Sequence, residues 1–272
     1  MLFRSGLAAA SLHIPYITHD SDALPGLANR IIARWAKIHA VALPEDVYNY
    51  PSNKTVMTGI PLQADFKKVS PQIIKQYRQE LKLPTEAKVL FIIGGGLGSQ
   101  KINVAVAEAV PHLLRQFPDL YVIHATGRAN KSDVAINYAN KLTDTEQKRL
   151  QVFDYIHDVY RYSGAADVVI TRAGATNLAE FALQGKACVV IPSPFLTGGH
   201  QLKNAQYLAD QNAATIMNEV DLTEDPHRLA NQVSELLKDD NLRDELGDRL
   251  ATFAKPNATR ELAQLILDQI KK

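Results

Sequence analysis

The sequence predicts an α/β fold organised around a doubly wound parallel sheet, and three observations lead to this prediction. From Lys88 onward, short runs rich in β-branched residues alternate with helical patterns, which is typical of βαβ units. Small-residue turns follow several of these runs where a helix is about to begin. The chain has 272 residues and is 46% hydrophobic, so it can bury the core that such a domain needs.

Six strands are expected in the main domain, at residues 89–93, 121–125, 151–153, 168–171, 187–191 and 214–217. Amphipathic helices separate them; residues 103–116, for example, place apolar side chains at helical spacing. After residue 223 the pattern is helical. The last helix, 258–272, has an apolar face formed by Leu262, Leu265 and Ile266, so it requires a surface to cover.

The segment before Lys88 is too short to form a comparable domain. It contains a predicted strand at residues 14–18, a helix from 24 to 36 and a second strand at 40–43. A sheet of two or three strands with open edges is only marginally stable. We therefore expect either a partner chain that supplies the rest or a chain that has lost its beginning.

Composition narrows the function classes. The formal net charge is +1 and acidic and basic residues are interspersed, which argues against nucleic acid as a partner. The single cysteine, Cys188, lies in an apolar run, so we expect it to be buried in a cytoplasmic protein. The first 17 residues superficially imitate a secretory signal, but His13 and Pro15 interrupt them. No segment reaches the roughly 20 apolar residues of a membrane span.

A glycine-rich turn at residues 94–99 follows the first strand of the main domain and precedes a helix. There, the backbone N–H groups around Gly95 and Gly96 can face an anion. The turn is not a P-loop, because Lys101 does not follow a glycine. The structural alternative is a tight connection between strand and helix.

The most informative segment is 172–180, at the carboxyl end of the fourth strand. Its small residues let a phosphate approach the start of the next helix, while Glu180 lies one turn further, where a carboxylate can accept hydrogen bonds from ribose hydroxyls. The alternative is a solvated helix glutamate. The candidate ligand-binding residues of this segment are Arg172, Gly174, Ala175, Thr176, Asn177, Leu178, Ala179 and Glu180.

Segment 198–205 follows the fifth strand, at the edge where doubly wound sheets bind ligands. His200 and Gln201 offer short donors and acceptors suited to sugar hydroxyls, and Asn204 follows one turn later. A capped surface helix is the alternative interpretation.

Another strand end opens into a helix at residues 18–30. His19 with Asp20 and Asp22 could perform acid/base chemistry or bind a cation, although their spacing matches no established metal site. Asp22 could equally cap the helix. Basic residues flank Trp35 further along, which fits either a membrane interface or a solvated helix face.

Taken in order, these motifs resemble the MurG family over essentially the whole chain. The resemblance is carried by segments 19–22 (His-Asp-Ser-Asp), 26–29 (Gly-Leu-Ala-Asn), 58–62, the glycine turn, 172–180, and 200–205. Members of that family transfer N-acetylglucosamine from UDP-N-acetylglucosamine to the lipid-linked muramyl pentapeptide. No single motif carries the resemblance; the set does.

The resemblance implies a GT-B fold, with two Rossmann-like domains facing across a cleft. It implies a partial N-terminal acceptor-side domain at 1–62, a connection at 63–86, a C-terminal UDP-sugar-binding domain at 87–257 and a final helix, 258–272, that returns to the N-terminal part.

The resemblance also assigns residue roles. Ile156 would meet the uracil, Glu180 the ribose and residues 175–179 the diphosphate, while Gln201 and His200 would contact the donor sugar. The set of implied catalytic residues is His19 and Asp20, and the further donor-binding residues are Asp22, Gly95, Gly96, Arg172, Gly174 and Asn204.

The implied reaction is an inverting, metal-independent transfer that needs no cofactor besides the UDP-sugar donor. The implied acceptor is linked to a polyprenyl diphosphate, so peripheral contact with the inner face of the cell membrane is expected. Three positions depart from the family: Asp22 replaces an amide, Gln63 a basic residue and Gly96 a serine. The family's N-terminal glycine-rich loop is absent from this sequence.

Two alternatives stay open. The chain could be a nucleotide-sugar-binding subunit that requires a complementary N-terminal chain to bind the acceptor. It could also be a related transferase that glycosylates a different membrane lipid.

Overall fold

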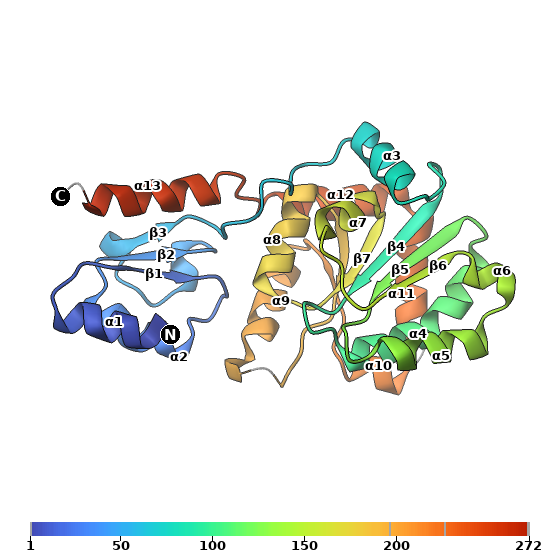
Figure 1. Ribbon diagram of the computed structural model, residues 1–272, viewed down its shortest axis with the longest axis horizontal. Helices are drawn as coiled ribbons and strands as arrows, with labels where there is room; N and C mark the ends of the chain where they lie inside the picture. The colour runs from blue at the N-terminus through green and yellow to red at the C-terminus, as the bar shows by residue number, and fades with distance from the viewer. Residues whose placement is uncertain (1, 196, 226, 271–272) are drawn as a thin grey trace.

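The structure, a computed structural model, describes residues 2–195, 197–225 and 227–270. Figure 1 shows a three-stranded sheet near the N-terminus and a six-stranded sheet in the rest of the chain. Every pair of neighbouring strands in both sheets is parallel. The predicted α/β class and the six parallel strands of the main sheet are therefore confirmed.

The six-stranded sheet has the order β6-β5-β4-β7-β8-β9. Its strands are β4 (Lys88–Ile93), β5 (Leu120–Ala125), β6 (Leu150–Phe153), β7 (Val168–Thr171), β8 (Ala187–Val190) and β9 (Thr215–Ile216). The chain order reverses direction between β4 and β7, so the turns that follow these two central strands diverge and leave a crevice at the carboxyl edge.

Helices cover both faces of this sheet. On β4, Leu90 and Ile92 pack into one buried cluster, whereas Val89, Phe91 and Ile93 pack into the other. The helices of this domain are α3 (Pro71–Glu80), α4 (Gln100–Gln116), α5 (Lys131–Lys141), α6 (Asp144–Gln147), α7 (Val159–Ala165), α8 (Ala175–Gln184), α9 (His200–Asp210), α10 (Asp221–Glu224), α11 (Arg228–Lys238) and α12 (Asp240–Ala251), with a short 3₁₀ turn η4 (Thr197–Gly199) before α9. None of the helices in the described ranges is long and apolar enough to cross a bilayer.

The N-terminal part is a three-stranded sheet of order β1-β2-β3. Its elements are α1 (Leu2–Ser11), β1 (Ile17–Asp20), α2 (Leu27–Ile32), η1 (Ala33–Trp35), β2 (Ile38–Val41), η2 (Glu45–Val47), η3 (Ser52–Lys54) and β3 (Thr55–Met57). The sequence interpretation missed α1 and β3 and placed the first strand too early. His13 adopts φ 55° and the Ile14 N–H donates to Ala9 O at 2.8 Å, so residue 14 closes α1 instead of starting β1.

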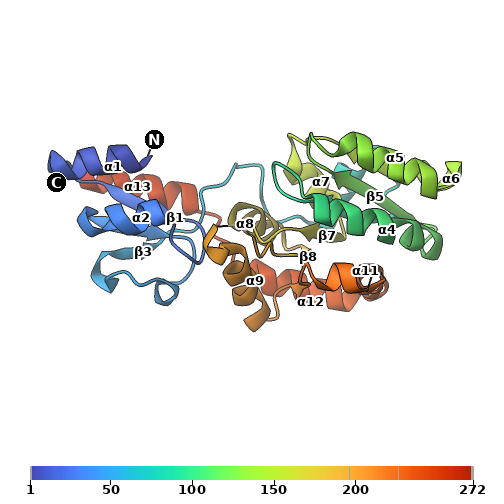
Figure 2. The same ribbon diagram turned by 90° about the horizontal axis from the view of Figure 1, so that it is seen from below.

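Helix α13 (Ala258–Ile270) lies beside the three-stranded sheet in both views, although α12 precedes it on the other sheet (Figures 1 and 2). At the crossing, Ala258 is buried and Thr259 Oγ1 donates to Leu62 O at 3.3 Å. Of the predicted apolar face, Leu262 and Leu265 are half-buried while Ile266 is exposed. The last two residues of the predicted range, 271–272, lie outside the described residues.

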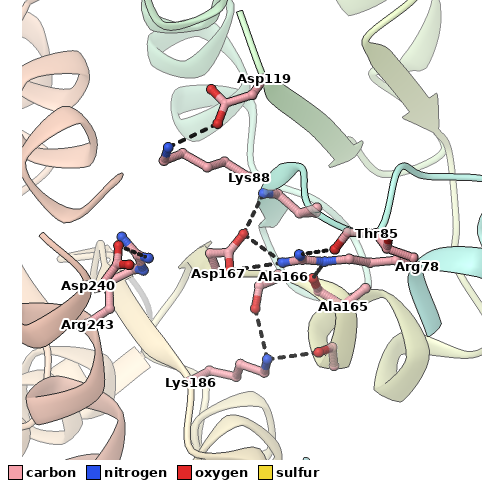
Figure 3. Close-up of polar contacts among 12 residues, drawn as sticks. Arg78, Thr85, Lys88, Asp119, Ala165, Ala166, Asp167, Lys186, Asp240 and Arg243 are labelled. Atoms are coloured by element: carbon pink, nitrogen blue, oxygen red, sulfur yellow. Dashed lines mark hydrogen bonds and ion pairs between the residues drawn. The ribbon is translucent and has the colours of Figure 1, made fainter. Parts of the chain in front are cut away.

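Helix α3 lies within the predicted connection but packs against the six-stranded domain through a buried ion pair (Figure 3). Arg78 donates to both carboxylate oxygens of Asp167, at 2.8 and 2.9 Å. Its other nitrogens donate to Ala165 O and Thr85 O. One Asp167 oxygen also accepts the Val89 N–H at 2.7 Å. This network therefore ties α3 to the start of β4 and β7.

Two further buried groups flank this network. The Lys186 ammonium donates to Gly164 O and Ala166 O, both at 2.8 Å, and burial lowers its pKa to about 8 (Figure 3). Cys188 is fully buried, as expected, and burial raises the pKa of its thiol to about 12. The thiol is therefore protonated and unreactive at neutral pH.

We expect Arg78→Met to lower the free energy of unfolding by about 3 to 5 kcal/mol, because it leaves the partly buried Asp167 carboxylate without its partner. Urea denaturation followed by far-UV circular dichroism measures this change. The matched control is Lys75→Met on the same helix, whose ion pair with Glu86 is exposed to solvent, so its loss should change the free energy of unfolding far less. Equal losses of unfolding free energy in the two variants would show that the buried ion pair stabilises the fold no more than the exposed one.

Candidate functional site

Three chain segments meet in one pocket at the carboxyl edge of the six-stranded sheet. They are the glycine turn after β4, the loop after β6, and α8 after β7; the connection before α3 and the turn after β5 complete the lining. The residues that line this pocket are Gln63, Phe66, Ile93, Gly95, Gly96, Ala125, Gly127, Asp154, Tyr155, Ile156, His157, Val159, Asn177 and Glu180. The structure thus brings together Gly95, Gly96, Ile156, Asn177 and Glu180, which the sequence singled out from positions far apart in the chain.

The structure gives two different reasons for the glycines in this turn, close backbone packing and open space beside the pocket. A Cβ on Gly98 would lie 2.0 Å from Thr126 O, and Gly98 has φ +75°, so this residue is required for close packing of two backbones. A Cβ on Gly95 or Gly96 would meet nothing within 4 Å. The open side of these two glycines faces the pocket, where a ligand can approach the backbone.

Helix α8 presents its N-terminus at the same edge. Its N-cap, Gly174, has extended backbone angles, and no side chain caps the first turn. The first N–H groups of a helix have no intrahelical partners and carry a partial positive charge. No acidic residue lies in this first turn, so it suits an anion such as a diphosphate. Around it, Thr176 is exposed, while Ala175 and Ala179 are half-buried.

Glu180 lies one turn further along α8 and lines the pocket beside Asn177. Burial raises the pKa of its carboxyl group to about 7, because desolvation disfavours the charged form. Ile156 is buried in the same pocket, in the loop after β6. The site therefore offers an apolar contact at Ile156 and a carboxyl group one turn beyond the open start of α8.

Arg172 lies below the pocket and is committed to protein partners. Its guanidinium forms an ion pair with Glu219, donates to Ser99 Oγ at 2.6 Å and donates to Ile191 O at 3.1 Å. Lys101 also pairs with the almost fully buried Glu219, at 3.0 Å. The arginine therefore joins the glycine turn to the end of β8.

The segment after β8 places its polar residues at the same sheet edge. Helix α9 begins at His200, directly after Gly198 and Gly199, which both have positive φ. His200 is half-buried. Gln201 is buried, and its side-chain oxygen accepts the Ser193 N–H at 3.0 Å. This bond fixes the start of the helix against the loop that precedes it.

Asn204 and Asp22 contact each other across the two parts of the chain. Asn204 Nδ2 donates to Asp22 Oδ1 at 2.8 Å, and Asn204 Oδ1 accepts the Ala23 N–H at 2.8 Å. Asp22 therefore lies in reach of the C-terminal domain, but its contact is to a protein amide.

His19 and Asp20 lie at the end of β1 and differ in their availability. Asp20 is buried, and its two oxygens accept hydrogen bonds from Asn29 and Tyr50, both at 2.8 Å. This carboxylate holds the loop after β1 in place. The half-buried His19 contacts Gly59 O through Nε2 at 2.9 Å. Because a carbonyl only accepts, Nε2 carries the proton, and the unprotonated Nδ1 contacts Ser21 Oγ at 3.4 Å.

The cation site considered for His19 with Asp20 and Asp22 finds no geometric support. Within the part of the chain that the structure describes, no group of three or more His, Cys, Asp or Glu side chains is arranged to hold a metal ion.

Several residues in or beside this pocket were not identified from the sequence. Phe66 and Tyr155 bring aromatic rings to the pocket, and Gly127 lies against the glycine turn. Beside the lining, the guanidinium of Arg128 is 5.1 Å from the centre of the Tyr155 ring. For the loop after β6, the sequence signal was the pair of ring side chains, Tyr155 and His157, on either side of Ile156.

A second, mostly apolar pocket lies on the other side of α8, between the two parts of the chain. Residues from the N-terminal part and the connection form one wall, and residues of α8, α9 and α12 form the other. Its lining consists of Ser21, Ala42, Leu43, Gly59, Ile60, Leu62, Ala175, Leu178, Ala179, Ala182, Asn204, Tyr207, Leu208, Leu250, Phe253 and Lys255. Helix α8 is thus a wall shared by two pockets.

Comparison with known proteins identifies relatives over nearly the whole chain. Residues 89–262 match the family model "Glycosyltransferase family 28 C-terminal domain". The protein is 30% identical over 266 residues to UDP-N-acetylglucosamine--N-acetylmuramyl-(pentapeptide) pyrophosphoryl-undecaprenol N-acetylglucosamine transferase of Acetivibrio thermocellus, which covers 97% of this chain and 69% of the relative. It is 31% identical to the enzyme of the same name from Geotalea daltonii, covering 97% of this chain and 68% of that one.

Solved structures agree with these relatives. The crystal structure of Acinetobacter baumannii MurG superimposes with a TM-score of 0.72 at 30% identity, covering 97% of this chain and 69% of that one. A UDP-GlcNAc 2-epimerase from Neisseria meningitidis, bound to UDP-GlcNAc, superimposes with a TM-score of 0.66 at 14% identity, covering 98% and 73%. The latter likeness shows a shared fold alone.

We expect Gly96→Leu and Gly98→Ala to separate ligand space from backbone packing. Gly96→Leu should keep the melting temperature of the protein and weaken UDP binding, because its side chain, larger than the serine that the family carries here, projects into open pocket space. Gly98→Ala should lower the melting temperature, because its Cβ would meet the Thr126 backbone. Differential scanning calorimetry and titration calorimetry with UDP measure the two effects. Full-strength UDP binding by Gly96→Leu would contradict a ligand at this turn.

Proposed function

Because the chain belongs to glycosyltransferase family 28 and, within it, to the MurG enzymes, we propose that it transfers N-acetylglucosamine from UDP-N-acetylglucosamine to the lipid-linked muramyl pentapeptide. This step converts lipid I to lipid II in peptidoglycan synthesis. The observation that carries the proposal is the pocket that joins Ile156, the glycine turn and Glu180 in the domain that the family model matches.

We propose one orientation for the UDP moiety in this pocket. We place the uracil against Ile156, the ribose hydroxyls at the Glu180 carboxylate and the diphosphate at the open first turn of α8. The remaining donor-binding positions are assigned by the family resemblance, with Gln201 and His200 toward the sugar. Fixed backbone dipoles at the α8 N-terminus would stabilise the negative charge that develops on the departing UDP.

The transfer is proposed to invert the anomeric centre without a metal ion. The acceptor hydroxyl oxygen attacks the anomeric carbon, its new bond to carbon forms as the bond to the UDP oxygen breaks, and the hydroxyl proton passes to a base. Of the two catalytic residues implied by the resemblance, His19 is the better candidate. Its unprotonated Nδ1 has only a long contact with Ser21 Oγ, at 3.4 Å, whereas both oxygens of Asp20 accept hydrogen bonds at 2.8 Å.

We expect the affinity for UDP to depend on the protonation state of Glu180. The pKa of its carboxyl group is raised to about 7, and the ionised form offers both oxygens to the ribose hydroxyls as strong, charge-assisted acceptors, whereas protonation turns one oxygen into a donor. Affinity should therefore fall as pH drops through 7, by about tenfold between pH 8 and pH 6. Titration calorimetry in buffers of different ionisation enthalpy measures both this trend and the proton released on binding.

Glu180→Gln is the control for this experiment. It should bind UDP weakly at every pH and retain only the pH dependence that comes from the UDP phosphate itself. If the wild-type protein and Glu180→Gln show the same affinity and the same pH dependence, Glu180 does not hold the ribose.

The acceptor suggests that the protein works at the inner membrane surface, and α1 and α2 offer a surface suited to that contact. A Cβ on Gly6 would lie 2.9 Å from Ile32 Cδ1, so these two helices pack closely side by side. Their exposed apolar residues are Phe3, Leu7, Leu27, Ile31 and, in η1, Trp35. Their exposed basic residues are Arg4, Arg30, Arg34 and, just beyond, Lys37, and neither helix contains an acidic residue. We name these nine residues the α1–α2 surface.

We expect the α1–α2 surface to bind vesicles that contain anionic phospholipid and not neutral ones. Trp35 is the only tryptophan of the chain, so a blue shift of its fluorescence reports insertion directly. Arg34→Gln should weaken binding about fivefold, since each basic residue contributes about 1 kcal/mol at an anionic surface. Ile31→Ala should also weaken vesicle binding. Its matched control is Ile136→Ala, which changes an exposed apolar residue on α5 and should leave binding unchanged. Equal vesicle binding by these two variants would argue against this surface.

We keep a second candidate, a nucleotide-sugar-binding subunit that requires another chain to bind the acceptor. The feature in its favour is β1, which has a paired neighbour only on its β2 side among the described strands and therefore presents free backbone groups on the other. Under this candidate the purified chain binds UDP but transfers no sugar until the complementary chain is added. Transfer of N-acetylglucosamine to lipid I by the purified chain alone would exclude it.

A further inference from the structure

A series of buried hydrogen bonds lies behind the glycine turn. It begins at Tyr138 on α5 and passes through His124 on β5. It continues through Asn103 on α4 and ends at the Thr126 carbonyl. Figures 1 and 2 show α4 and α5 side by side on one face of the six-stranded sheet, so the series crosses between the two helices through a strand. All three side chains are at most 2% exposed, and we name them the Asn103 network.

Every hydrogen bond of the Asn103 network has a fixed direction. Because Thr126 O can only accept, Asn103 Nδ2 donates to it, at 2.9 Å. Asn103 Oδ1 is then the acceptor, and the proton that it accepts is on His124 Nε2, at 3.1 Å. Nδ1 of the same ring is unprotonated and accepts from the Tyr138 hydroxyl at 3.0 Å. Burial lowers the pKa of His124 to about 3, so the ring is neutral and the directions are the same throughout the neutral pH range.

The network ends where two segments of the pocket lining touch each other. Thr126 O lies so close to the glycine turn that a Cβ on Gly98 would be 2.0 Å from it. On the next residue, a Cβ on Gly127 would be 2.3 Å from Leu97 O. The glycine turn and the turn after β5 are therefore in direct backbone contact, and both line the pocket that we assign to UDP.

Thr126 also connects to the loop after β6. Its N–H donates to Phe153 O at 2.9 Å, and the pocket-lining loop that contains Ile156 begins directly after Phe153. Asn103 is itself joined to the glycine turn, because its N–H donates to Ser99 O at 2.8 Å. One buried amide thus connects the glycine turn to the turn after β5, which in turn holds the loop of Ile156.

We propose that Asn103 and His124 are positioning residues for the donor, which hold the glycine turn at a fixed distance from the turn after β5 and the loop of Ile156. This inference rests on the proposed UDP site. Neither residue is among those that line the pocket, so both act from behind the lining. Close packing limits only how near the two turns can approach, whereas a directed hydrogen bond also prevents them from moving apart. A site held in this way binds its ligand more tightly, because less order has to be created on binding.

The test compares the two ends of the network. Asn103→Ala removes the bonds to His124 and to Thr126 O, and Thr126 O keeps only its longer bond from Asn130 Nδ2, at 3.2 Å. Tyr138→Phe is the matched control, because it removes only the hydroxyl at the far end and keeps the bonds that reach the turn. Each variant leaves one nitrogen of the buried His124 ring without a partner, so both should lower the melting temperature.

We expect Asn103→Ala to weaken UDP binding at least about tenfold, whereas Tyr138→Phe should change the dissociation constant of UDP less than about twofold. Titration calorimetry, at a temperature where all three proteins are folded, measures the affinities, and differential scanning calorimetry measures the melting temperatures. Unchanged UDP affinity in Asn103→Ala would overturn the proposal. Equal losses of affinity in the two variants would also overturn it, because the network would then contribute to stability alone.

Variants of His124 test the direction of the bond to Asn103. The side-chain amide of His124→Gln can donate to Asn103 Oδ1 from near the position of Nε2, so this variant should keep most of the UDP affinity. His124→Leu has no donor and should lose affinity as Asn103→Ala does. Loss of affinity in both variants, or in neither, would contradict the proposed role of this bond.

Hydrogen exchange followed by mass spectrometry tests the positioning without a ligand. In Asn103→Ala, peptides that cover the glycine turn and residues 126–127 should exchange faster than in the unmodified protein, and in Tyr138→Phe they should not. Unchanged exchange in Asn103→Ala would overturn the proposal. Failure of the unmodified protein to bind UDP, with the exchange as expected, would reject the proposed function but leave the positioning of the two turns intact.

If Asn103→Ala does not fold, nitrogen NMR of the unmodified protein provides the test. The His124 ring should carry its proton on Nε2, and the Nε2–H resonance should shift when UDP is added, because the network ends at the pocket lining. A proton on Nδ1 instead, or an Nε2–H resonance that stays unchanged at saturating UDP, would overturn the proposal.

Discussion

The site depends on one constraint, the parallel direction of all six strands of the main sheet. Parallel strands deliver the turn that follows each of them to the same edge, and the order β6-β5-β4-β7-β8-β9 separates the turns after β4 and β7. The glycine turn, the loop around Ile156 and the start of α8 come from different crossovers and still line one pocket. Backbone topology, rather than any single side chain, creates the place where a nucleoside diphosphate can bind.

Within that frame, α8 combines two opposite electrostatic environments. Its N-terminus begins at Gly174 with unpaired amides and no acidic residue, which favours negative charge. One turn later the burial of Glu180 disfavours negative charge and raises the pKa of the carboxyl group to about 7. A diphosphate at the first position and hydroxyl donors at the second satisfy both environments, which is the arrangement of charge and hydroxyls found in a nucleoside diphosphate.

The N-terminal part contributes through a few long-range contacts. Helix α13 lies beside its sheet, while Asn204 reaches its β1 loop from the C-terminal domain. Between these contacts the lining of the second pocket is mostly apolar. The two parts are therefore joined by hydrogen bonds at Asn204 and at Thr259 and by apolar packing between them, which is suited to a cleft whose two walls must hold two substrates.

The sequence by itself determined the six strands of the main sheet and two segments of the candidate pocket, the glycine turn and the start of α8, because strand and helix periodicity and small-residue turns are local signals. It missed α1, β3 and the packing of α3, whose places depend on the His13 turn, on a three-residue pairing and on the Arg78 ion pair. Only the tertiary structure decided that both oxygens of Asp20 are already bonded and that Asn204 spans the cleft. The physical reason is separation: the Ala23 N–H that Asn204 binds is 181 positions away, and no local pattern encodes such a pairing.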